Sequence, residues 1–210
     1  MSDGARPENR RGTVELGIVP GEFVDPGDHI ACFWETEADF RRAVRFLSVG
    51  LRRGDYGVVF GHPEANARVL AALTDAQVGC GALLDADRLA VVEGEACGAR
   101  MLAGLTARFR AARARGAPLI RLLGNLGWGR PGWPGDADLL RFEASVTDAV
   151  RGVPAVVVCL YDVRGVSGEI LLRGAIGTHR LTIWRNLVRE NPHYVPLADF
   201  VAELAPRPAD

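Results

Sequence analysis

Histidines and carboxylates are the side chains of this 210-residue chain that could carry acid–base or metal chemistry. His62, His179 and His193 could act as general acids or bases beside nearby carboxylates, because an unperturbed imidazole titrates close to neutral pH. The same residues could bind a metal ion, but none of them has the HxH, HxxxH or HExxH spacing of a metal-binding pair. We therefore expect no metal site and no other cofactor.

The cysteines also lack the spacing of a metal or catalytic motif. There is no CxxC pair, and no Ser-His-Asp or Cys-His arrangement can be assigned. Cys32 and Cys159 lie inside apolar, strand-like runs, where a free cysteine behaves as a small hydrophobic residue. His29 opens such a run, and we interpret it as a structural hydrogen-bonding residue.

Composition excludes several classes of function. Apolar residues make up 48% of the chain and charged residues 24%, as in ordinary globular proteins. The net charge of −1 gives no reason to expect nucleic-acid binding. Every basic residue is arginine, which excludes a Schiff-base lysine and the lysine of a phosphate-binding loop.

The N-terminal residues lack the apolar core of a secretory signal, and no apolar run has membrane-spanning length. We expect a cytoplasmic protein with reduced thiols and no membrane contact.

Strand-like and helix-like segments alternate along most of the chain, which predicts a mostly parallel sheet with helices on both faces. The expected strands are His29–Trp34, Tyr56–Gly61, Arg88–Gly94, Pro118–Asn125 and Pro154–Asp162. The expected helices between them are Phe40–Leu51, Pro63–Leu73, Cys97–Arg115 and Asp136–Val150, the last capped by Asp136. After Asp162 we expect a helix at Ser167–His179, a strand at Leu181–Asn186, a turn with an extended tail, and a helix at Leu197–Leu204. Residues 1–12 are expected to be flexible and residues 13–210 to form a single domain.

The segment from His29 to Asp55 has the strand, loop and helix order of a phosphate-binding element, but its loop has different residues. The loop Glu35–Phe40 contains no glycine, no lysine and no hydroxyl at the position that would bind Mg²⁺. It carries three carboxylates instead, those of Glu35, Glu37 and Asp39, which would repel a polyanion. We therefore expect neither ATP nor Mg²⁺ to bind, and no ATPase activity.

Ligands of open α/β sheets bind beyond the carboxyl ends of the strands, and this rule selects a set of candidate residues. The set is aromatic with a few polar groups, as small-molecule pockets usually are. It comprises Phe33, Trp34, Glu35, His62, Glu93, Asn125, Trp128, Tyr161 and Asp162, with His179 if the following helix folds back over this edge. Two readings of the glycine- and tryptophan-rich loop at residues 124–136 stay open: a mobile lid, or a surface loop whose tryptophans pack over the core.

Several of these residues also resemble the pattern of a known family, the MEDS sensory domains of methanogen and methylotroph regulators. The matches run in order from His29 to Tyr194: His29, Cys32, Phe33, Gly50, Leu51, Gly54, Glu143, Cys159, Tyr161, Asp162, His179, Asn191, Pro192 and Tyr194. The resemblance implies a three-layer RecA/KaiC-like fold without the phosphate-binding loop, used to sense small molecules such as hydrocarbon derivatives. It also implies a partner of histidine kinase or anti-sigma type. We add Glu143 to the expected ligand-binding set; the alternative is that it forms a helix–loop hydrogen bond.

The leading hypothesis is therefore a non-catalytic sensory domain that binds a small, partly apolar ligand and regulates a partner protein. The alternative is an enzyme that reuses the degenerate pocket, with His62, His179, Glu143 or Asp162 as acid–base groups. A pure interaction module is a third reading, and the sequence leaves homo-oligomer formation open.

Overall fold

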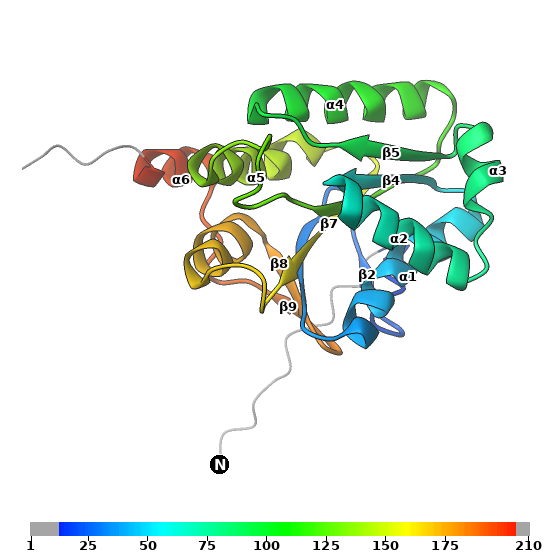
Figure 1. Ribbon diagram of the computed structural model, residues 1–210, viewed down its shortest axis with the longest axis horizontal. Helices are drawn as coiled ribbons and strands as arrows, with labels where there is room; N and C mark the ends of the chain where they lie inside the picture. The colour runs from blue at the N-terminus through cyan, green and yellow to red at the C-terminus, as the bar shows by residue number, and fades with distance from the viewer. Residues whose placement is uncertain (1–12, 205–210) are drawn as a thin grey trace, which may run out of the picture.

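A seven-stranded sheet forms the middle layer of the protein (Figure 1). In this computed structural model, which describes residues 13–204, the strand order is β5-β4-β6-β7-β3-β8-β9. All neighbouring strands are parallel except β8 and β9. The strands of this sheet are β3 (His29–Trp34), β4 (Tyr56–Gly61), β5 (Leu89–Glu93), β6 (Ile120–Asn125), β7 (Ala155–Asp162), β8 (Leu181–Trp184) and β9 (Leu187–Glu190). The expected flexible segment 1–12 lies outside the described residues.

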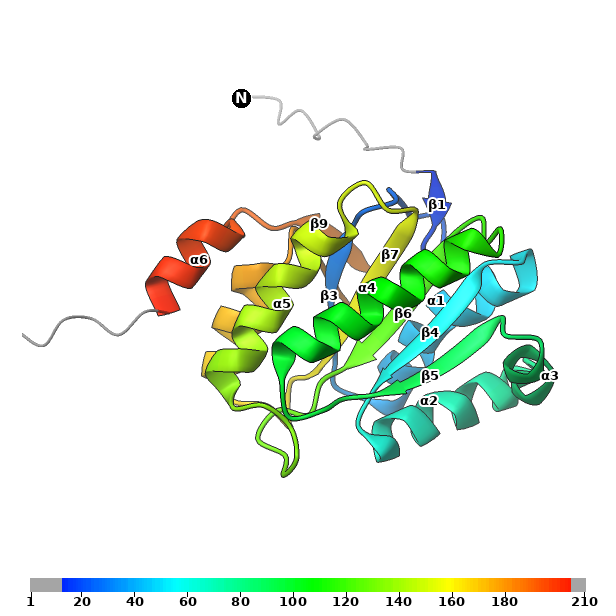
Figure 2. The same cartoon turned by 90° about the horizontal axis from the view of Figure 1, so that it is seen from above.

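Helices cover both faces of the sheet, so the expected three-layer α/β fold is confirmed. Figure 1 shows α4 (Gly98–Ala114) and α5 (Asp136–Val150) above the sheet, with α1 (Glu37–Arg53) and α2 (Pro63–Asp75) below it. Figure 2, seen from above, shows α4 crossing in front of the strands and α6 (Leu197–Leu204) beside α5. A short helix, α3 (Cys80–Asp85), and a two-stranded sheet of β1 (Val14–Glu15) and β2 (Phe23–Val24) complete the fold. No helix of residues 13–204 is long and apolar enough to cross a membrane.

Alternation along the strands decides which side chains meet which helices. On β3, Ile30 and Cys32 point toward α1 and belong to the core on that side. Ala31 belongs to the core on the opposite side, with residues of α4 and α5. On β7, Cys159 and Tyr161 also face α5, and Tyr161 pairs in register with Phe33. The strand β7 is buried along almost its whole length, as its continuous apolar run predicts.

Helix α1 begins and ends with strong local signals, which place it at the expected position with slightly wider bounds. The Thr36 side chain accepts a hydrogen bond from the Asp39 amide, and the Asp39 carboxylate accepts one from the Thr36 amide. This capping box satisfies the amides that a helix N-terminus leaves free. Gly54 ends the helix with φ 98°, a left-handed conformation that glycine adopts without strain.

A buried ion pair lies between α1 and the sheet. Arg121 of β6 donates from Nε to the Asp55 carboxylate over 2.7 Å and from Nη1 to the carbonyls of Glu15 and Phe46. Gly50 makes room for it, because a Cβ there would lie 2.2 Å from Arg121 Nε. The pair joins β6, α1 and the N-terminal strand in one polar contact.

The region after β7 differs from the expectation in two ways, and the N-terminus of α5 differs in a third. The expected helix Ser167–His179 contains a π-helix, η1 (Ile170–Ile176). The segment after Asn186, expected as a turn with an extended tail, instead begins with strand β9, because Arg185 adopts φ 55° and lets the chain turn back along β8. Asp136 is not the cap of α5, since Gly135 occupies that position without a side-chain hydrogen bond. Helix α6 forms as expected and packs on the outer face of α5 through Phe200.

Candidate functional site

Four side chains that could bind a metal meet under α5, although they come from distant parts of the chain. His29 opens β3, Glu143 lies in the middle of α5, Cys159 lies in β7, and His179 follows η1. One donor atom from each residue lies within 4.8 Å of the donor atoms of the other three. The relative exposures of the four residues are 2%, 0%, 5% and 0%, so this buried cluster is shielded from water. We call it the His–Glu–Cys cluster.

The distances within the His–Glu–Cys cluster are short. His29 Nε2 lies 3.2 Å from Cys159 Sγ and 3.3 Å from Glu143 Oε2. Cys159 Sγ lies 3.5 Å from Glu143 Oε2, and His179 Nε2 lies 3.8 Å from the same oxygen. The two imidazole rings have centroids 3.9 Å apart. The Glu143 Oε2 atom is thus within 4 Å of the other three donors.

Neighbouring groups fix how each imidazole carries its hydrogen. The Thr147 hydroxyl donates to the Thr178 carbonyl over 3.0 Å, so it is left to accept from His29 Nδ1 at 2.9 Å. His179 Nδ1 lies 3.0 Å from the Ala175 carbonyl, which can only accept. Both rings therefore hold their hydrogen on Nδ1 and turn the lone pair of Nε2 toward the cluster. His179 Nε2 finds no hydrogen-bond partner among the described residues.

Tyr161 supports the carboxyl group from the other side. Its hydroxyl donates to Glu143 Oε1 over 2.9 Å, and its ring stands edge-on to that of His179 at 5.7 Å. Phe33 packs beside Tyr161 with a centroid distance of 6.1 Å, and beside Trp184 at 6.3 Å. The cluster is therefore enclosed by aromatic rings toward the carboxyl ends of β3 and β7.

Burial sets the protonation of the cluster. It lowers the pKa of His29 to about 3. Burial, with His29 beside it, also lowers the pKa of His179 to about 3, against the opposing effect of Glu143. It raises the pKa of Glu143, and the pKa values of Cys159 and Tyr161 rise well above their usual ranges because of burial and of the adjacent Glu143. The imidazoles are neutral and the thiol and phenol keep their protons at neutral pH.

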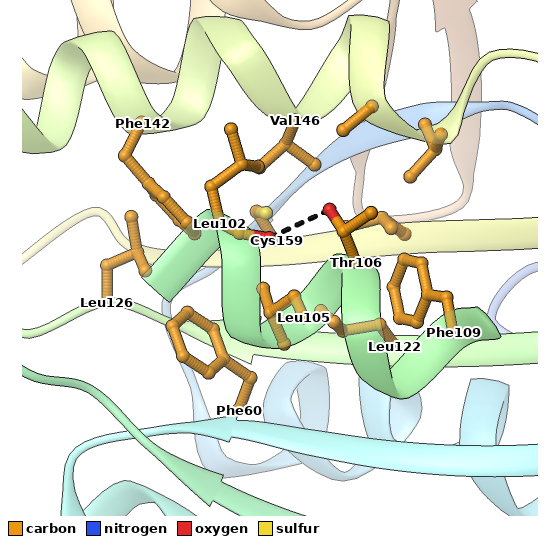
Figure 3. A pocket seen from close by; sticks show the side chains of 13 residues that line it. Phe60, Leu102, Leu105, Thr106, Phe109, Leu122, Leu126, Phe142, Val146 and Cys159 are labelled. Atoms are coloured by element: carbon orange, nitrogen blue, oxygen red, sulfur yellow. Dashed lines mark hydrogen bonds between the residues drawn. The ribbon is translucent and has the colours of Figure 1, made fainter. Parts of the chain in front are cut away.

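An apolar cavity adjoins the cluster, between α4, α5 and the strands β4, β6 and β7. The centre of a water-sized sphere can reach about 20 Å³ of it. Figure 3 shows side chains of α4 and α5 converging on this space, with Cys159 on the wall shared with the cluster. Its lining consists of Phe60, Leu102, Leu105, Thr106, Phe109, Leu122, Leu126, Phe142, Val146, Ala149, Val150, Val157 and Cys159.

Of the candidates selected by sequence, Glu143 and His179 belong to the cluster, Tyr161 donates to Glu143, and Phe33 packs beside Tyr161. Sequence reasoning missed His29 and Cys159 as members, and Thr147 as the partner of His29. The signal that could have found Cys159 is the alternation along the strands, since Cys159 and Tyr161 are two residues apart and share a face.

Most other candidates lie at the carboxyl ends of the strands, and three of them already contact nearby polar groups. Glu35 accepts a hydrogen bond from Arg164, and the Asp162 carboxylate caps its own turn through the Arg164 amide. His62 caps α2 and contacts Glu64 over 2.8 Å. Glu93 is exposed and Asn125 is half-buried at the ends of their strands.

Trp34 points to the opposite face from the cluster. Its ring contacts Phe40 at 5.4 Å, and the Arg68 guanidinium stacks over it at 4.7 Å. Its side chain therefore belongs to the α1 side of the sheet, which separates it from Phe33 and Tyr161.

The two tryptophans of the 124–136 loop pack against the body of the protein. Trp133 contacts Phe60 at 6.1 Å and leaves no space for a Cβ at Gly94 or Gly127, where the nearest ring atoms would lie 2.2 and 2.5 Å away. Trp128 packs near Gly174 of η1. This is the arrangement expected if the tryptophans pack over the core.

Comparison with known proteins supports the fold and shows the family. None of the curated proteins compared with the chain matches it. Among solved structures, the uncharacterized protein PH0321 from Pyrococcus horikoshii, solved in complex with an unknown peptide, is similar over 76% of this chain and 78% of its own, with a TM-score of 0.57 and 14% identity. At that identity the similarity shows the fold alone. The family model of the methanogen/methylotroph DcmR sensory domain matches residues 28–180, a span that includes all four members of the His–Glu–Cys cluster. The chain therefore belongs to the MEDS family of sensory domains.

Proposed function

We propose that this sensory domain detects a small, largely apolar molecule, which binds in the cavity between α4, α5 and the sheet. Occupancy of the cavity would then change how the domain contacts a regulatory partner of histidine kinase or anti-sigma type. The observation that carries the proposal is the apolar cavity itself, enclosed by side chains of two helices and three strands.

The size of the cavity limits the ligand to a few non-hydrogen atoms. About 20 Å³ is open to the centre of a water-sized sphere, where roughly 10–15 Å³ is enough for one water molecule. A short or halogenated hydrocarbon derivative is of this size. Larger ligands would have to displace Leu105 or Phe142 from packed positions, at a cost in contacts.

The chemistry of the lining favours an apolar ligand. Eleven of the thirteen lining residues are apolar. The Thr106 hydroxyl donates to the Leu102 carbonyl over 2.8 Å within α4, so its hydrogen is already used. A strongly polar solute would lose its hydrogen bonds to water here and gain few in return. The polarisable Cys159 sulfur is well suited to contact a halogen or methyl group.

The region beyond the carboxyl ends of the strands is less suited to an apolar ligand. Charged candidates there already pair with other side chains, as Glu35 does with Arg164 and His62 does with Glu64. At the N-terminus of α1 the amide of Asp39 is capped by Thr36, and Glu37 pairs with Arg68. We expect no thermal stabilisation by ATP and no ATP turnover at this position.

Helix α5 contacts both the cavity and α6, so a movement of α5 would connect the two. Phe142 and Val146 line the cavity, while Leu140 and Ala144 on another side of the helix pack with Phe200 of α6. A ligand that pushes α5 away from α4 would therefore also shift the contact between α5 and α6. We expect α6 to be the element whose exposure to a partner changes.

The test compares binding of two probes, xenon and dichloromethane, to the wild-type chain and to a filled-cavity variant. Ala149→Leu adds three carbons to a residue that lines the cavity, and Ala103→Leu makes the same change at an exposed position of α4. Methyl and aromatic NMR signals at the cavity should shift on addition of either probe to the wild type and to Ala103→Leu, and should stay unchanged in Ala149→Leu. A ligand at 100 times its Kd should stabilise the fold by about 2.7 kcal/mol.

Equal responses of the two variants, or shifts confined to the sheet edge around Glu35 and His62, would overturn the cavity as the ligand site. Signalling is tested separately by hydrogen exchange. Amides of α6 should exchange at a different rate when the cavity is occupied, and an unchanged rate would exclude α6 as the reporting element. Light scattering with and without the probe reports whether homo-oligomer formation is part of the response.

A further inference from the structure

We propose that His29, Glu143, Cys159 and His179 form a four-ligand site for a divalent transition metal of the zinc type. The inference goes beyond the proposed sensory function and does not depend on ligand binding in the cavity. It rests on the positions of the four donor atoms, on the direction of their lone pairs, and on the charges that the site would neutralise.

The spacing of the donors suits a tetrahedral ion. Zinc bonds of 2.0–2.3 Å to nitrogen, oxygen and sulfur imply donor–donor distances of roughly 3.3–3.8 Å in a tetrahedron. The distances from Glu143 Oε2 to the other three donors are 3.3, 3.5 and 3.8 Å, and that from His29 Nε2 to Cys159 Sγ is 3.2 Å. All four donors lie within 4.8 Å of one another. Small side-chain movements would be enough to place an ion among them.

The hydrogen bonds around the cluster prepare both imidazoles as ligands. Thr147 accepts from His29 Nδ1, and the Ala175 carbonyl accepts from His179 Nδ1. Metal-binding histidines are commonly held in this way, with the second ring nitrogen donating to an oxygen. The buried His179 Nε2, which has no hydrogen-bond partner among residues 13–204, points its lone pair at Glu143. A cation between them would satisfy this orphaned acceptor.

The charges balance in the same way. A divalent cation with one thiolate and one carboxylate gives a site of zero net charge, which suits a position closed to water. Binding forms a metal–sulfur bond and releases the Cys159 thiol proton to solvent; a proton on the Glu143 carboxyl would leave in the same manner. No oxidant or reductant is required.

The donor set favours zinc over the common alkaline-earth ions. Ca²⁺ and Mg²⁺ prefer oxygen donors only, whereas one thiolate, two imidazoles and one carboxylate suit Zn²⁺ or a chemically similar ion. Four protein ligands would close the coordination sphere, which is the form of a structural site. The ion would tie β3, α5, β7 and the segment after η1 together. It would also hold the Cys159 sulfur as a thiolate at the wall of the cavity.

The test is the metal content of the full chain, measured after expression in zinc-supplemented medium and after refolding with Zn²⁺. We expect about one Zn²⁺ per chain that survives gel filtration with a weak chelator. Refolding with Co²⁺ should produce the visible bands of a tetrahedral ion and a near-ultraviolet charge-transfer band from a thiolate. Less than about a tenth of an equivalent of either metal in the wild type, under both preparations, would overturn the proposal.

Variants then assign the ligands. Cys159→Ser and His179→Ala should reduce metal affinity by at least the roughly 10–100-fold seen for losses around a site, and Cys159→Ser should also remove the charge-transfer band. Cys32→Ser makes the same change at a buried cysteine on the other face of the sheet and should keep one ion per chain. Glu143→Gln, which keeps its shape, provides a ligand variant if the first two fail to fold. Retention of metal by these ligand variants, or its loss in Cys32→Ser, would contradict the assignment.

Discussion

Replacement of Thr147 by valine tests how the cluster is held in place. The hydroxyl of Thr147 accepts from His29 Nδ1 at 2.9 Å and donates to the Thr178 carbonyl at 3.0 Å, and all three groups are buried. Valine keeps the branched shape of the side chain but can neither accept nor donate. The substitution therefore removes two hydrogen bonds and leaves an N–H and a carbonyl in the interior without this partner.

The expected loss of stability follows from those two groups. A buried donor or acceptor that loses its partner costs about 1–3 kcal/mol. Two such groups give a loss of roughly 2–4 kcal/mol, since some relaxation around the new methyl group is expected. This is a large share of the roughly 5–15 kcal/mol that stabilises an ordinary domain, so the midpoint of unfolding by urea should move clearly.

Thr106→Val provides the matched control. Thr106 is also a helical threonine whose hydroxyl donates to a carbonyl, that of Leu102 four residues earlier, and it faces the apolar cavity. The Leu102 carbonyl remains within the hydrogen-bonded helix, so the change should cost less than about 0.5 kcal/mol. Urea unfolding followed by circular dichroism should be measured for both variants with a chelator present, so that any bound metal does not contribute.

The tautomer of His29 gives a second measurement on the same variant. Nitrogen chemical shifts should show the hydrogen on Nδ1 in the wild type and a mixture of tautomers in Thr147→Val, because the accepting oxygen has gone. With metal present, the loss of this outer partner should weaken zinc binding by about 10–100-fold. If Thr147→Val and Thr106→Val unfold at the same urea concentration and His29 keeps one tautomer in both, then Thr147 does not position His29.

Two further substitutions test the packing that surrounds the site. Arg121→Met leaves the buried Asp55 carboxylate unpaired and should lower the free energy of unfolding by about 3–5 kcal/mol. Arg113→Met, on the exposed side of α4, should change it by less than about 0.5 kcal/mol in the same urea titration. Similar losses for both variants would exclude a stabilising ion pair. In Gly94→Ala the new Cβ would lie 2.2 Å from the ring of Trp133, so the ring should leave its site and its fluorescence should shift to the red. Gly81→Ala is the control: its new Cβ would have no heavy atom within 4 Å, so the spectrum should stay unchanged. An unshifted spectrum in Gly94→Ala would contradict the packed position of the 124–136 loop.

The parts of the fold that sequence predicted well are those with a strong local pattern. The run Pro154–Asp162 is apolar along its length because both faces of β7 are covered, and this makes such a strand visible without knowledge of its neighbours. The helix at Phe40–Leu51 is marked by one apolar face and by Gly54 at its end. These signals depend on the residue itself and on the next few residues.

The parts that sequence did not predict depend on distant contacts. Strand β9 exists because it pairs with β8, and its residues are mostly exposed, so no apolar alternation marks it. The π-helix η1 packs against α5. At its end the Asn191 side chain, which follows β9, donates to the carbonyls of Ile176 and His179. A hydrogen bond of this kind cannot be read from the composition of Ser167–His179.

The candidate site was found only in part for the same reason. The rule that ligands bind at strand ends selected residues by their position along each strand and gave no weight to the face on which they lie. His29 begins its strand and Cys159 lies near the middle of another, so the rule passed over both. They become neighbours only because β3 and β7 pair in parallel with His29 opposite Val157, two residues before Cys159 and on the same face.

Helix α5 joins the two features on which our proposals rest. Phe142 and Val146, four residues apart, face the cavity, while Glu143 and Thr147, also four residues apart, face the His–Glu–Cys cluster. Since residues at this spacing share one side of a helix, a rotation or shift of α5 would alter both faces at once. A polar cluster at the centre of an otherwise apolar layer costs stability compared with leucine or valine at the same positions. Such departures from a locally optimal sequence are expected at functional sites, and here the departure lies on the helix that contacts the cavity, the cluster and α6.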